Sequence, residues 1–124
     1  MSRQEKIVEI LELLRKFDTF SISSHINPDG DAIGSQIAIY SLLLDFGKKA
    51  YIINSDPVPF NYNFLPYVGN YQLVNSAENY PSNIEVAIIL DCGNIKRIGE
   101  KLIDKIKPKI GIINIDHHLN NNNF

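Results

Sequence analysis

The chain has 124 residues, a net charge of -2, 44% hydrophobic residues and a single cysteine. These values are typical of one soluble globular domain, and they exclude a large basic surface for long duplex nucleic acid. One cysteine cannot form an internal disulfide, and no apolar run approaches the roughly 20 residues that cross a bilayer. The composition therefore predicts a soluble cytoplasmic protein without a membrane segment.

Helical and extended patterns alternate along the first half of the chain. Apolar residues recur at helical spacing over 3–16, and residues 18–23 carry the aromatic and branched side chains typical of a strand. A polar loop leads into a second helical pattern over 31–46, which Gly47 is suited to end. Residues 49–53 are predicted to form the next strand.

The second half opens with the least regular segment, residues 54–80, where we expect only a short helix over 61–65. The continuous apolar run 86–90 is typical of a strand buried on both faces. A weak helix over 98–106 and another apolar strand over 109–115 follow. This alternation favours a parallel sheet flanked by helices, which is a Rossmann-like α/β fold.

The loop after the first predicted strand carries His25, Asp29 and Asp31. Two carboxylates two residues apart on a turn can diverge and bind different ions, and His25 can reach the same ion as Asp29. We expect Gly30 to allow a tight turn with a positive φ between them. Alternatively, the two carboxylates are turn and N-cap residues and His25 is a surface histidine.

Acidic and histidine residues also follow the two later apolar strands. Asp91 ends the first of these strands, and Asp116, His117 and His118 end the second. Because the carboxyl ends of parallel strands meet at one edge of a sheet, we expect these groups to lie beside the first loop. Clustered carboxylates need a counter-charge, which two divalent cations would supply, and mixed carboxylate and imidazole ligands suit Mn²⁺.

The combined pattern is His25-x-x-x-Asp29-x-Asp31-x-x-Gly34-Ser35, then Asp91, then Asp116-His117-His118. It resembles the N-terminal domain of the DHH phosphoesterase superfamily over nearly the whole chain. The branch it resembles most contains oligoribonucleases that also act as 3′-phosphoadenosine 5′-phosphate phosphatases. The resemblance implies a metal-dependent hydrolase whose substrates are short oligonucleotides or nucleotide phosphates.

The resemblance also implies two sets of metal ligands that share one carboxylate: His25 and Asp29 for the first ion, Asp31 and His117 for the second, and Asp91 for both. It implies that His118 contacts the scissile phosphate as an electrostatic stabiliser or acid. Asp116 would orient its neighbours.

The sequence departs from this family at its carboxyl end. Family members have a further aspartate ligand on a later segment and a separate C-terminal substrate-binding domain, whereas this sequence stops at Phe124. We therefore expect residues 1–124 to be a truncated catalytic domain with weak or no activity in isolation and a weak second metal site. Apolar surface left exposed where another domain would dock can then lead to a homodimer.

Other functions are compatible with parts of the pattern. Manganese inorganic pyrophosphatases have a similar first motif but typically show Asp-Thr-Asp-Ser where this chain has Asp29-Gly30-Asp31-Ala32, which favours the oligonucleotide branch. A cyclic-dinucleotide phosphodiesterase would usually add membrane and sensory segments. A non-catalytic Rossmann-like interaction module would use the same acids as turn residues, although no Gly-x-Gly-x-x-Gly follows the first strand.

Overall fold

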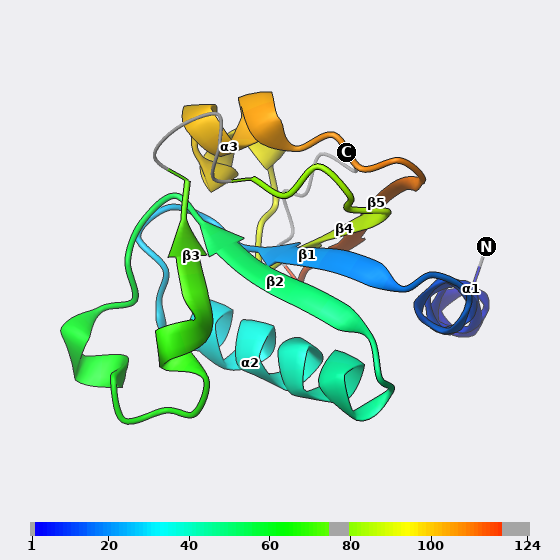
Figure 1. Cartoon of the computed structure of the whole chain (residues 1–124), viewed down its shortest axis with the longest axis horizontal. Coiled ribbons are helices and arrows are strands. Elements are labelled where there is room, and N and C mark those ends of the chain that lie inside the picture. Colours follow the sequence, from blue (N-terminus) through cyan, green and yellow to red (C-terminus); the bar gives the residue numbers. More distant parts are fainter. Residues whose placement is uncertain (1, 75–79, 118–124) are drawn as a thin grey trace.

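The computed structural model describes residues 2–74 and 80–117, which form one twisted sheet with helices on both faces (Figure 1). The helices are α1 (Arg3–Lys16), α2 (Gly30–Asp45) and α3 (Glu100–Lys105), with short 3₁₀ turns η1 (Phe60–Tyr62), η2 (Val68–Asn70) and η4 (Ile95–Ile98). The strands are β1 (Thr19–Ser23), β2 (Lys49–Asn54), β3 (Tyr71–Leu73), β4 (Val86–Leu90) and β5 (Gly111–Ile115). None of the helices in the described residues has the length and apolarity needed to span a bilayer.

All paired strands are parallel, and their spatial order is β3-β2-β1-β4-β5. The chain first adds strands on one side of β1 and then returns to add β4 and β5 on the other side. In the register of the sheet, Phe20 of β1 lies opposite Ala50 of β2 on one side and Val86 of β4 on the other. Open α/β sheets bind ligands beyond the carboxyl ends of the strands at such a switch point. The predicted Rossmann-like α/β fold is confirmed.

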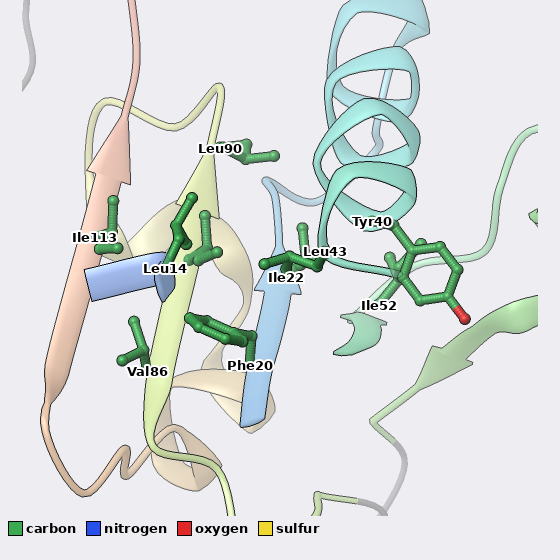
Figure 2. Close-up of a cluster of buried hydrophobic side chains, with 10 residues drawn as sticks. Leu14, Phe20, Ile22, Tyr40, Leu43, Ile52, Val86, Leu90 and Ile113 are labelled. Atoms are coloured by element: carbon green, nitrogen blue, oxygen red, sulfur yellow. The ribbon is translucent and has the colours of Figure 1, made fainter. Parts of the chain in front are cut away.

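The two faces of the sheet carry separate apolar clusters because successive side chains of a strand point to opposite faces. On one face, α1 and α2 cover the strands, and Figure 2 shows Leu14 reaching the cluster from α1 and Leu43 from α2. On the other face, Leu102 of α3 packs with Ile89 and with Cys92. Cys92 is 1% exposed, so it is a packing residue of this second cluster.

Capping chemistry sets the ends of the two long helices. The Ser2 side chain caps α1 by accepting a hydrogen bond from the Glu5 N–H at 3.1 Å. Asp29 caps α2 in the same way, through the Ala32 N–H at 2.9 Å. Gly47 follows the end of α2 with φ of 73°, the left-handed conformation that glycine adopts at little cost.

Three elements differ from the sequence-based expectation. The helix predicted over 61–65 is the 3₁₀ turn η1, and β3 was not predicted. The helix predicted over 98–106 is divided into η4 and α3 at Gly99, whose φ is 104°. A side chain on Gly99 would also collide with the Ser55 side chain, so this position requires glycine.

Candidate metal centre

The predicted site residues come together at the carboxyl edge of the sheet. They form two groups that share one residue: His25, Asp29 and Asp91, and Asp31, Asp91 and His117. Within each group the ligand-type atoms all lie within 4.8 Å of one another. The loops after β1, β4 and β5 and the first turn of α2 supply these side chains, as expected for ligands at a topological switch point.

Asp91 lies between the two groups and turns a different carboxylate oxygen toward each histidine. Its Oδ2 is 3.3 Å from His25 Nε2, and its Oδ1 is 3.0 Å from His117 Nε2. The side chain is only 5% exposed, and the backbone φ of 53° lies in the left-handed region. That conformation costs a residue other than glycine on the order of 1–3 kcal/mol, and such strain clusters at functional sites.

The first group has a histidine whose ring orientation is fixed. His25 Nδ1 lies 2.6 Å from the Ile26 carbonyl oxygen, which can only accept a hydrogen bond, so Nδ1 carries a proton. Nε2 is then either protonated, which makes His25 a cation, or it presents a lone pair toward Asp29 and Asp91. The second arrangement is the one that a metal-binding imidazole adopts, with its other nitrogen bonded to a carbonyl.

Asp29 both caps α2 and lies near His25. Its Oδ1 accepts the capping hydrogen bond from Ala32, and the same oxygen lies 3.8 Å from His25 Nε2. The N-cap alternative is therefore correct for Asp29. It does not exclude a ligand role, because a carboxylate has two oxygens and several acceptor sites.

The histidine of the second group is open to solvent, unlike His25. His117 Nε2 lies 3.0 Å from Asp91 Oδ1 and 2.9 Å from Asp31 Oδ2, while the His117 side chain is 70% exposed. The hydrogen bonds to Asp91 and then to Asp31 raise the pKa of His117 above its ordinary 6.5. When His117 is protonated, it provides positive charge between two carboxylates. Ser35 Oγ also donates to Asp31 Oδ1 at 3.4 Å.

A cavity of about 180 Å³ opens beside the second group. The residues that line it are Asp31, Ser35, Leu90, Asp91, Ile115, Asp116 and His117. The predicted positioning residue Asp116 therefore faces the same space as the second group. The predicted catalytic residue His118 lies outside the described residues.

Gly30 does not have the role expected for it. It is the first residue of α2, and it is not among the described residues with positive φ. Its constraint is steric, because an ideal Cβ at this position would lie 3.1 Å from Tyr62 Oη. The expectation of a positive φ was wrong, since it considered only the local turn and not the contact with η1.

Three polar side chains that sequence reasoning missed lie beneath the site, and all are 0% exposed: Ser24, Gln36 and Asn54. Asn54 exchanges two hydrogen bonds with Gln36, at 2.8 and 3.0 Å. Asn54 Oδ1 also accepts from the Ser24 N–H at 3.0 Å. A signal of the burial of Gln36 was available, because it lies three residues after Ile33 and four before Tyr40, on the apolar face of the predicted helix.

Known proteins resemble this chain over nearly its full length. Residues 19–124 match the family model described as DHH family, N-terminal domain. The bifunctional oligoribonuclease and PAP phosphatase NrnA of Thermus thermophilus is 33% identical over 121 residues, which is 97% of this chain and 34% of that protein. The protein of the same name in Mycoplasma genitalium is 29% identical over 121 residues, covering 95% of this chain and 36% of that protein.

A solved structure shares the fold. An exopolyphosphatase-related protein from Bacteroides fragilis has a TM-score of 0.84 and 27% identity, over 96% of this chain and 37% of that chain. The chain thus spans about a third of the length of the curated relatives described above, at 34% and 36%. With its two groups of acids and histidines at the switch point of a parallel sheet, the chain belongs to the DHH family and corresponds to its N-terminal domain.

Proposed function

We propose that this domain is a dinuclear metal-dependent phosphoesterase. It would hydrolyse phosphodiester or phosphomonoester bonds in short oligoribonucleotides or nucleotide phosphates. The observation that carries the proposal is the position of Asp91, whose two carboxylate oxygens face two separate groups of ligand-type side chains. Two-metal phosphoesterases need ions held close together, and a shared carboxylate is suited to hold them.

The chemistry of the donor set fits two divalent cations. Within the described part of the chain, the ion pairs of Asp29, Asp31 and Asp91 are all with histidines. With neutral imidazoles the cluster carries a net negative charge, which divalent cations would balance. In this proposal one ion would be held by His25 and Asp29. The other would be held by Asp31 and His117, and Asp91 would be shared by both ions. Mixed imidazole and carboxylate ligands favour Mn²⁺.

The two groups differ in the burial of their histidines, and this difference suggests how a substrate approaches. The side chain of His25 is 10% exposed and that of His117 is 70% exposed, whereas the carboxylates Asp29 and Asp31 are similarly open at 63% and 55%. The cavity also opens beside the second group. We therefore infer that the substrate phosphate enters over Asp31 and His117.

Divalent ions at such a site supply charge neutralisation for the phosphate oxygens and lower the pKa of a bound water. The protein's own residues bind and orient the reacting groups. Asp116 lines the cavity and would hold its neighbours in place. His118 would stabilise charge on the scissile phosphate.

The names of the relatives support the substrate class. Two relatives are named as oligoribonucleases and PAP phosphatases, and their substrates are short RNA and a nucleotide phosphate. The chain spans only 34% and 36% of those proteins.

The proposal is tested by cleavage of a 5′-labelled diadenylate with the protein in molar excess, with and without Mn²⁺. We expect Mn²⁺-dependent cleavage that Asp91→Asn reduces by about 100-fold or more. Asp45→Asn is a matched control, because Asp45 is an exposed carboxylate at the opposite end of α2. Inorganic pyrophosphate as a parallel substrate tests the pyrophosphatase alternative.

Two results would contradict the proposal. One is cleavage that does not need metal or that survives Asp91→Asn. The other is an absence of cleavage together with an absence of Mn²⁺-dependent binding of inorganic phosphate. In the second case the acids are turn residues of a non-catalytic module.

A further inference from the structure

We propose that Ser24, Gln36 and Asn54 form a buried clamp that positions the two metal-binding loops at the ends of β1 and β4. The inference rests on the proposed function and deepens it, since it assigns positioning residues to the same site. It concerns residues that do not contact the metals or the substrate in that proposal.

The clamp joins the ends of neighbouring strands. Asn54 is the last residue of β2, and its Oδ1 accepts from the Ser24 N–H at 3.0 Å. Ser24 follows β1 directly, and its Oγ donates to the Leu90 carbonyl at the end of β4 at 2.7 Å. Ser24 and Leu90 are the residues immediately before His25 and Asp91. A shift of Ser24 therefore changes the position of His25 relative to Asp91.

Gln36 holds the Asn54 amide in a single orientation. Gln36 Nε2 donates to Asn54 Oδ1 at 2.8 Å, and Asn54 Nδ2 donates to Gln36 Oε1 at 3.0 Å. If the Asn54 amide were reversed, its NH₂ group would face the Ser24 N–H and the Gln36 NH₂ group. Gln36 belongs to α2, the helix whose first turn carries Asp31, so the clamp also ties the second group to the strand ends.

Complete burial makes this arrangement sensitive to loss of any member. The three side chains are 0% exposed, so water cannot replace a missing partner. Buried networks whose members are all satisfied hold one geometry, and removal of one member leaves unsatisfied groups that force a rearrangement. Residues that support metal ligands from outside the coordination sphere typically change metal affinity by about 10- to 100-fold when substituted.

The neighbouring Ser23 provides a matched comparison. Ser23 and Ser24 are both 0% exposed and adjacent in the chain. Ser24 Oγ bonds to Leu90, whereas Ser23 Oγ has no hydrogen-bond partner among the residues that the structure describes. Each Ser→Ala change removes one buried oxygen, but only Ser24→Ala breaks a link between the two loops.

The experiment compares wild type, Ser23→Ala, Ser24→Ala and Gln36→Met in calorimetric titrations with Mn²⁺. Titrations are made well below the lowest melting temperature, so that every variant is folded. We expect Ser24→Ala and Gln36→Met to weaken Mn²⁺ binding by about tenfold, and Ser23→Ala to bind like wild type. The electron paramagnetic resonance spectrum of bound Mn²⁺ should change in the first two variants only, because zero-field splitting responds to ligand geometry.

Each other outcome overturns the inference. Unchanged affinity and spectra in Ser24→Ala and Gln36→Met would show that the clamp does not position the ligands. Equal weakening in Ser23→Ala would show a general effect of strand packing. If neither clamp variant folds while Ser23→Ala does, the clamp determines folding and not metal geometry. Failure of the wild type to bind Mn²⁺ would instead refute the proposed function, and the clamp proposal would fall with it.

Discussion

Asp91 and His117 lie at the ends of adjacent strands, and their side chains meet at 3.0 Å between Oδ1 and Nε2. The sheet register brings them together, because Leu90 lies opposite Ile115 in the parallel pairing of β4 with β5. The Asp91 N–H donates to the Ile115 carbonyl at 3.0 Å and continues this pairing past the end of β4. The sheet register therefore sets the spacing of Asp91 and His117.

This relationship predicts a pH dependence of metal binding. The hydrogen bonds to Asp91 and Asp31 raise the pKa of His117 in the metal-free protein. A metal binds only the neutral imidazole, so binding releases a proton. We expect Mn²⁺ affinity to fall as the pH drops through the raised pKa of His117, as measured by calorimetry across pH. An affinity independent of pH across that range would exclude His117 as a ligand.

The same pKa shift predicts how His117 affects the stability of the metal-free protein. A raised pKa in the folded state means that His117 stabilises the fold fully below its ordinary pKa of 6.5. This contribution is lost as the pH rises through the raised pKa. Asp91→Asn should lower the pKa of His117 toward 6.5, because it weakens the hydrogen bond that raises this pKa most. Histidine proton chemical shifts followed by NMR against pH measure this, and an unchanged pKa would contradict the assigned cause.

Asp29 allows its capping role and its ligand role to be separated. Asp29→Asn keeps an oxygen that can accept from the Ala32 N–H, whereas Asp29→Ala removes it. We expect Asp29→Ala to lower the free energy of unfolding by about 1 kcal/mol and Asp29→Asn to change it by a few tenths. Both variants should bind Mn²⁺ more weakly. Urea unfolding and Mn²⁺ titration measure the two effects, and full Mn²⁺ affinity in Asp29→Asn would remove Asp29 from the ligand set.

Glu85 predicts a second pH effect, far from the metal centre. Its Oε1 accepts from the backbone N–H groups of Asp18 and Thr19, at 3.0 and 3.1 Å. These bonds, with the Asp18 bond the largest cause, lower the pKa of Glu85 below its ordinary 4.5. Glu85 therefore stabilises the fold above pH 4.5, and this stabilisation is lost as the pH falls through the lowered pKa.

We expect Glu85→Gln to be less stable than wild type at neutral pH and to approach wild type in acid. Urea unfolding at a series of pH values measures the difference. Glu9→Gln, on the exposed side of α1, is the control and should follow wild type throughout. A constant difference between Glu85→Gln and wild type would mean that the charge of Glu85 is not responsible.

Gly99 is a position where the backbone demands glycine. Its φ is 104°, and a Cβ would collide with the Ser55 side chain. We expect Gly99→Ala to lower the free energy of unfolding by about 1–3 kcal/mol from backbone strain alone. Gly69→Ala is the control, because nothing lies within 4 Å of a Cβ at that position and it should change stability by less than about 0.5 kcal/mol. Equal stability of the two variants, measured by urea unfolding, would contradict this account.

Local sequence patterns were sufficient to predict the long helices and the central strand, and to predict that the site residues lie together. The bounds predicted for α1 and β4 match the structure, because the helical period is sustained and the apolar run is continuous. The start of α2 was predicted within one residue, because the apolar face that includes Ile33 and Ile37 has helical spacing. The rule that parallel strands end at one edge predicted that Asp91 would lie beside His25, and these side chains are 3.3 Å apart.

The missed features depend on contacts between distant parts of the chain. Strand β3 has three residues, too few for a pattern, and it exists because it pairs with β2. The constraint on Gly30 comes from Tyr62, which lies in η1, beyond α2 and β2 in the sequence. The pairing of Gln36 with Asn54 likewise required the placement of α2 against the end of β2. No local rule in the sequence indicates these three contacts.

We propose that Asp91 joins two metal-binding groups, and a calorimetric titration with Mn²⁺ distinguishes this arrangement from ordinary turn residues. Wild type, Asp91→Ala and the control Asp45→Ala are titrated under the same conditions. We predict saturable binding by wild type and Asp45→Ala, and no detectable binding by Asp91→Ala. Binding by Asp91→Ala as tight as that of wild type would remove Asp91 from the ligand set, and a wild type that does not bind Mn²⁺ would refute the metal centre.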